Sequence, residues 1–137
     1  MEVYDLESSA NSLLANLSTR GFVETADNVM IGGFISGGQS APTQVLLRGI
    51  GPSLKGQLPN ALDNPVLQLL DENGAVIASN DNWKDTQRSE IEETGIPPSH
   101  DLEAAILRTL SPAVYTAILR GKNGTVGIGL VEIYNIR

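Results

Sequence analysis

Turn-forming residues recur along this chain at intervals too short for long helices. Fourteen glycines and seven prolines among 137 residues separate short runs that are rich in Val, Ile, Leu and Thr. Such runs are typical of strands joined by turns, so the sequence predicts an all-β, antiparallel β-sandwich with at most short helical turns. The expected strands span residues 1–6, 14–23, 28–36, 43–49, 66–71, 75–79, 104–110, 114–120 and 127–136.

Two Asn-Gly pairs stand between apolar runs. Asn tolerates, and Gly readily adopts, the positive φ angles of a tight turn, so Asn73-Gly74 and Asn123-Gly124 each predict a β-hairpin. The segment 101–110 fits either a helix with an Asp N-cap or a strand. Pro112 and the strand expected after it favour a strand from Ala104 onward, and residues 90–94 are expected to hold one helical turn.

Composition excludes several classes of protein. Hydrophobic residues make up 41% of the chain and charged residues 18%, which is too apolar for a disordered segment and fits one folded domain. The net charge is −7 and the nine Lys and Arg residues form no cluster, so neither nucleic acid nor an anionic membrane is an expected partner. No run of 18 apolar residues occurs, so we expect no membrane insertion. Cysteine is absent, which excludes thiol chemistry without fixing the compartment.

The two ends of the chain carry similar segments. The first six residues, MEVYDL, align with VEIYNI at 131–136, with Glu and Tyr identical and the other four positions chemically similar. Apolar residues alternate with Glu in both copies, which predicts two half-buried strands that turn the same face inward and compete for one position in the sandwich.

Three interpretations of this repeat remain open. The spare copy fills the sheet of a neighbouring subunit by strand addition, or it is the tail of a preceding repeat in an array, or it occupies a second, pseudo-symmetric position in the same domain. We therefore divide the chain into an N-terminal strand segment, residues 1–12, and a sandwich domain, residues 13–137. The predicted strand-exchange interface consists of Glu2, Val3, Tyr4, Leu6, Val131, Glu132, Ile133, Tyr134 and Ile136.

Several motifs together carry a resemblance to a known kind of module. They are NLSTRGFV at 16–23, IGGFI at 31–35, LRGIGPSL at 47–54, SNDNW at 79–83 and YTAILRG at 115–121. The chain resembles tandem modules of large extracellular proteins from environmental bacteria, and its later half is similar to bacterial pre-peptidase C-terminal β-sandwich domains. The resemblance implies export, a jelly-roll-like sandwich and tandem or fibrous assembly, and it supplies no catalytic residue. Ala113 departs from the Gly usual before the Tyr, which puts the geometry of that turn in doubt.

Oxygen-bearing side chains gather along one stretch of sequence. Asp71, Asn73, Asp81 and Asp85 are candidate ligands for calcium, which takes six to eight oxygens. Their spacing does not match a helical calcium loop, and Asx residues are the usual turn formers of β proteins, so turn formation is the favoured interpretation. No cofactor is expected, with calcium as the open alternative.

The remaining candidates for chemistry do not combine into an active site. His100 is the only histidine and no Gly-x-Ser-x-Gly motif accompanies it, so we expect no enzyme. Trp83 is expected to anchor a loop or the core, and Arg48 to make a structural ion pair. The sequence thus predicts a structural subunit of an extracellular or cell-surface filament or tandem-repeat fibre, whose partners are copies of itself joined head to tail by strand exchange. The alternative is a calcium-stabilised accessory module that binds glycans or surfaces.

Overall fold

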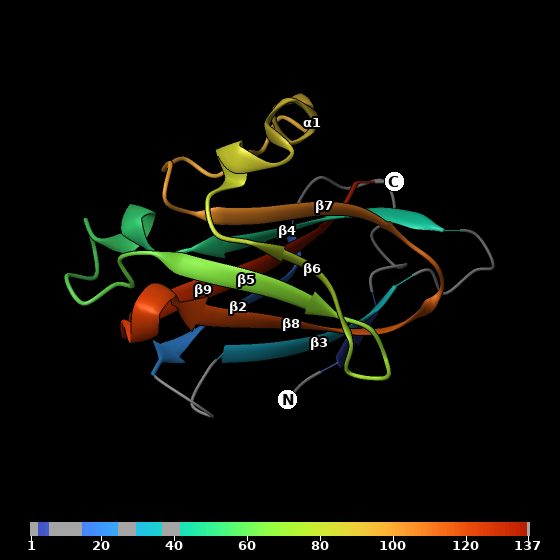
Figure 1. The fold of residues 1–137 in the computed structure, drawn as a ribbon, viewed down its shortest axis with the longest axis horizontal. Coiled ribbons are helices and arrows are strands. Elements are labelled where there is room, and N and C mark those ends of the chain that lie inside the picture. The colour runs from blue at the N-terminus through green and yellow to red at the C-terminus, as the bar shows by residue number, and fades with distance from the viewer. Residues whose placement is uncertain (1–2, 6–14, 25–29, 37–41, 137) are drawn as a thin grey trace.

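The computed structural model describes residues 3–5, 15–24, 30–36 and 42–136, which form two packed β-sheets (Figure 1). A five-stranded sheet has the order β1-β3-β8-β5-β6, and a four-stranded sheet has the order β2-β9-β4-β7. The strands are β1 Val3–Asp5, β2 Ala15–Val23, β3 Met30–Ser36, β4 Thr43–Ile50, β5 Pro65–Leu70, β6 Val76–Asn80, β7 Ala104–Leu110, β8 Ala113–Gly121 and β9 Gly127–Asn135. One short helix, α1 Arg88–Glu93, and 3-10 turns at Pro52–Leu54, Trp83–Asp85 and Lys122–Gly124 complete the described elements.

The strand pairing is that of a jelly roll. Four antiparallel pairs are nested in sequence, with β5 against β6, β4 against β7, β3 against β8 and β2 against β9. This nesting describes one long hairpin of eight strands that is rolled up into two sheets. The predicted antiparallel, jelly-roll-like sandwich is therefore confirmed. Strand β1 is additional to the eight and pairs with β3 in the parallel direction.

The core lies between the two sheets. Leu67, Leu69 and Leu119 of the five-stranded sheet face Leu47 and Ile133 of the other, and all five are fully buried. Alternate residues along each strand supply this face, as the period of a strand requires. Burial of such side chains stabilises the fold by about 1.5–3 kcal/mol each.

A second apolar layer covers the outer face of the four-stranded sheet. Trp83 and Ile91, which belong to the segment around α1, are buried against Leu46, Leu107 and Tyr134. Figure 1 shows α1 beyond β7, on the outside of the sandwich. Strand β9 is consequently covered on both faces near its C-terminal end.

The first predicted hairpin is confirmed. Its turn is a three-residue loop in which Gly74 N donates to Asp71 O at 3.0 Å and Asp71 N donates to Ala75 O at 2.9 Å. Gly74 has φ +84°, and a type I turn followed by a left-handed Gly is a common three-residue hairpin connection.

The second predicted hairpin is wrong. Asn123 and Gly124 do adopt positive φ angles, but β8 and β9, which flank them, lie in different sheets. The chain leaves β8 along the 60–64 loop, where Lys122 N donates to Asn64 O and Ile128 N donates to Asn60 O. These bonds direct β9 across to the other sheet, so the turn connects two sheets instead of two paired strands.

The ambiguous segment from Asp101 forms strand β7 from Ala104, so the helical alternative is wrong. The turn after it does not need the glycine that Ala113 replaces, because Ala113 has no positive φ. Tyr115 holds the turn instead, since its hydroxyl donates to Ser111 O at 2.7 Å.

Candidate functional site

The N-terminal copy of the repeated segment forms the edge strand β1. Val3, Tyr4 and Asp5 lie opposite Gly33, Phe34 and Ile35 of β3. Glu2 and Leu6, the other predicted interface residues of this copy, lie outside the described residues.

The C-terminal copy lies in the middle of the other sheet, as β9 between β2 and β4. Val131 and Ile133 point into the core, Glu132 and Tyr134 lie on the opposite face, and Ile136 N donates to Gln44 O at 2.8 Å. The expectation that both copies compete for one position is therefore wrong for the single chain, because each has a position of its own. The predicted alternation holds in β9 as far as Ile133, since Glu132 on the outer face is partly exposed, and it ends at Tyr134, which the segment around α1 helps to bury.

These positions differ in how much of the fold depends on them. Strand β9 has nine residues and pairs along both sides, so its removal would leave β2 and β4 without a shared neighbour. Strand β1 has three residues, pairs along one side and lies outside the eight-strand roll. Of the two copies, β1 is the one that can leave without dismantling a sheet.

The Glu and Tyr of the C-terminal copy have a structural role. Glu132 Oε1 accepts hydrogen bonds from Nε (3.0 Å) and Nη2 of Arg48, whose guanidinium lies 5.2 Å from the ring centre of Tyr134. Arg48 Nη1 also donates to Ile96 O at 3.1 Å. Burial raises the pKa of Tyr134, an effect that the Arg48 charge opposes. The structural ion pair expected for Arg48 is thus confirmed, and it fastens the segment after α1 to the sheet.

Sequence reasoning missed a second polar cluster, around the fully buried Glu103. Its Oε2 accepts from the main-chain nitrogens of Gly51 (3.1 Å) and Ser53 (2.8 Å), and its Oε1 accepts from Ser53 Oγ (2.7 Å) and His100 N (3.3 Å). The Glu103 carbonyl accepts from Trp83 N at 2.9 Å. One buried carboxylate therefore joins the RGIGPSL motif to the start of β7. The available signal was an acidic residue at the start of an otherwise apolar run.

The predicted calcium ligands do not come together. Asp71 and Asn73 precede β6, whereas Asp81 and Asp85 follow it, so a five-residue strand separates the two pairs. Asp71 Oδ1 accepts from the main-chain nitrogens of Asn73 (2.9 Å) and Ala75 (3.0 Å), which is the turn-forming role that the sequence favoured. Asp81 pairs with Lys122 Nζ at 2.5 Å. Within the described ranges, no group of three or more His, Asp or Glu residues is placed to hold a metal ion.

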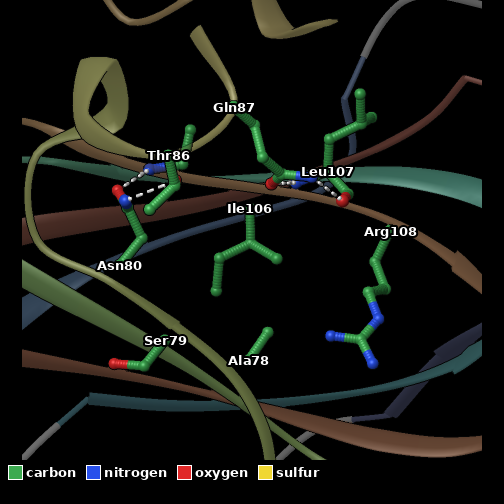
Figure 2. A pocket seen from close by; sticks show the side chains of 9 residues that line it. Ala78, Ser79, Asn80, Thr86, Gln87, Ile106, Leu107 and Arg108 are labelled. Atoms are coloured by element: carbon green, nitrogen blue, oxygen red, sulfur yellow. Dashed lines mark hydrogen bonds between the residues drawn. The ribbon is translucent and has the colours of Figure 1, made fainter.

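A crevice of about 170 Å³ opens between the edge strands β6 and β7 (Figure 2). Strand β6 contributes Ala78 to Asn80, and β7 contributes Ala105 to Arg108. Thr86 and Gln87, which precede α1, form its third wall. Trp83 is only 4% exposed and is therefore not placed to stack on a sugar ring.

The fold and these clusters define a jelly-roll β-sandwich module whose described polar clusters bind its own main chain. No family model and no curated protein matches the chain. Among solved structures, it is similar to the pre-peptidase C-terminal domain of a collagenase from Bacillus anthracis, with a TM-score of 0.54, 8% identity, and coverage of 96% of this chain and 94% of that one. This likeness confirms at the level of the fold the resemblance inferred from sequence.

FlgD from P. aeruginosa matches less well, with a TM-score of 0.33, 12% identity, and coverage of 92% of this chain and 78% of that one. In the part of the chain that the structure describes, no helix is long and apolar enough to span a membrane.

Proposed function

We propose that this chain is a non-enzymatic structural subunit of an extracellular filament or tandem-repeat fibre, joined head to tail by exchange of its N-terminal strand. The observation that carries the proposal is the position of β1. It repeats the sequence of β9, yet it is a short parallel addition to an eight-strand roll that is already complete.

Strand exchange requires a strand whose bonds can be reproduced by a neighbour. Val3, Tyr4 and Asp5 from another copy would offer β3 the same main-chain groups in the same register, so exchange loses no described pairing. Concentration then decides between the closed and the exchanged form. In a tandem array the next module is tethered, which raises its effective concentration to the millimolar range for short flexible linkers.

The described polar groups support a structural role. The Glu103 carboxylate and the Arg48 guanidinium both bind main-chain groups of this chain, so they are committed to holding loops. The extracellular location rests on the resemblance to exported bacterial modules and on the fold shared with a domain of a bacterial collagenase. The alternative of a calcium-stabilised glycan-binding module gains no support, because its oxygen ligands are separated and Trp83 is buried.

The absence of native cysteine allows a direct test. Tyr4 and Phe34 are register partners, and partners across adjacent strands lie close enough for a disulfide. One full-length chain carries Tyr4→Cys and a second carries Phe34→Cys, and the two are mixed under mild oxidation. We expect a mixed disulfide, with Tyr4→Cys plus Thr109→Cys as the unreactive control, because Thr109 lies on β7 at the opposite edge.

Electron microscopy and size-exclusion chromatography complete the test. Removal of residues 1–6 is expected to leave a folded domain that no longer elongates, whereas removal of residues 131–137 should unfold the chain by deleting half of β9. Absence of a mixed disulfide between the Tyr4→Cys and Phe34→Cys chains, together with filaments that persist without residues 1–6, would show that the joint lies elsewhere.

A further inference from the structure

The sandwich has two lateral sides, each with one edge strand from each sheet. Strands β6 and β7 form one side, and β1 and β2 form the other. An edge strand presents unpaired N–H and C=O groups, which are a template for another strand. A fibre subunit therefore needs one side open and the other closed.

The outer edge of β7 is already occupied. Two of its main-chain N–H groups bind side chains from the preceding segment, as Ala105 N donates to Asn80 Oδ1 at 2.9 Å and Leu107 N donates to Gln87 Oε1 at 3.0 Å. Gln87 Nε2 in turn donates to Leu107 O at 2.8 Å. This side-chain amide makes the pair of bonds that a residue of an added antiparallel strand would make (Figure 2).

Both blocking side chains are held in place. Asn80 is 5% exposed, and its Nδ2 donates to Asn82 O at 3.1 Å and to Thr86 Oγ1 at 3.2 Å. Gln87 stands immediately before α1, which is anchored by the fully buried Ile91. Arg108 adds a bond across the crevice, where its Nη1 donates to Ile77 O of β6 at 2.6 Å.

We propose that Asn80 and Gln87 occupy the strand-addition site of β7, so that a neighbouring copy does not add its N-terminal strand at this edge and adds it beside β3. The inference rests on the proposed function and specifies which edge accepts the partner.

The test uses full-length chains in which Tyr4→Pro blocks pairing through the terminal strand, since proline has no N–H for a ladder. Gln87→Ala is then added, and Gln57→Ala, at an exposed loop position, is the matched control. We expect the Leu107 amide to exchange with solvent about tenfold faster in Gln87→Ala, as the loss of one hydrogen bond predicts. A synthetic peptide of residues 1–6 then supplies the donated strand, and isothermal titration calorimetry counts the peptides bound. We expect the Gln87→Ala chain to bind two, one beside β3 and one at β7, and the Gln57→Ala chain to bind one beside β3.

Two outcomes would overturn the inference. Unchanged exchange at Leu107 would mean that Gln87 does not protect the edge, and fast exchange with only one peptide bound would mean that the bared edge accepts no strand. Failure of the proposed function has a different signature, because Tyr4→Pro with Gln87 intact would then elongate like the unmodified chain. The role of Gln87 is judged by comparing Gln87→Ala with Gln57→Ala, both in chains that carry Tyr4→Pro.

Discussion

Replacement of Glu103 by alanine tests whether one buried carboxylate holds the RGIGPSL motif to the sheet. The substitution removes the acceptor of four hydrogen bonds, three of them from main-chain nitrogens at 2.8, 3.1 and 3.3 Å. Each buried donor left without a partner costs about 1–3 kcal/mol, but the two donors of Ser53 can bind water instead, because Ser53 is exposed. We therefore expect a loss of about 3–5 kcal/mol in the free energy of unfolding, and a Tm about 10–15 °C lower for a domain of this size.

Glu103→Gln separates the loss of charge from the loss of shape. The amide keeps one acceptor oxygen, but its NH2 group faces donors, so about 1–3 kcal/mol of the stability should be lost. Trp83 is the only tryptophan and its main-chain N–H donates to the Glu103 carbonyl, so fluorescence-detected urea unfolding reports on this region directly.

Glu90→Ala, at an exposed position of α1, controls for the removal of any acidic side chain. If the free energy of unfolding of Glu103→Ala lies within about 1 kcal/mol of that of the unmodified chain, the buried carboxylate does not hold the RGIGPSL motif to the sheet.

Further predictions concern the other polar contacts. Burial raises the pKa of Tyr115 and of Tyr134. The stability that the two protonated hydroxyls contribute is therefore complete below the unfolded pKa of about 10 and is lost as the pH rises through the folded pKa. Replacement of both tyrosines by phenylalanine should make the urea midpoint fall less steeply at alkaline pH. Arg48→Ala should cost about 2–3 kcal/mol in urea unfolding, and Arg48→Lys should recover only part, because lysine lacks the planar fork that binds Glu132. Asp71→Ala should cost about 1 kcal/mol by thermal unfolding while Asp71→Asn costs less, and added calcium should leave the Tm unchanged.

Local sequence signals were enough to predict the strands but not all of their partners. Residue alternation and turn residues place each strand to within about two residues, as for β4 at Thr43–Ile50 and β7 at Ala104–Leu110. The error at Asn123-Gly124 arose because a turn determines where the chain reverses, not which sheet receives the next strand. That choice depends on bonds to residues 60–64, which are distant in sequence.

The candidate site was predictable only where its signal was a repeated pattern. Alignment of the chain ends revealed β1 and β9, but their separate sheets follow from the nested pairing of the roll. Glu103 and Gln87 were missed because their partners are main-chain groups about 50 and 20 residues away. Nearly every residue has these main-chain groups, so the sequence does not indicate which residue a buried Glu or Gln will bind.

The number of open edges determines what kind of assembly a strand-donating subunit can make. A subunit that donates one strand and accepts one strand grows into a linear chain, because each copy then has two joints. A second accepting edge at β7 would give each copy three joints, and growth would branch into a network. The side chains of Asn80 and Gln87 bind the β7 main chain from within the same subunit, at no loss of pairing inside the roll. In a fibre joined as proposed, these two amides therefore remove β7 as a further accepting edge, and their bonds favour linear growth over branching.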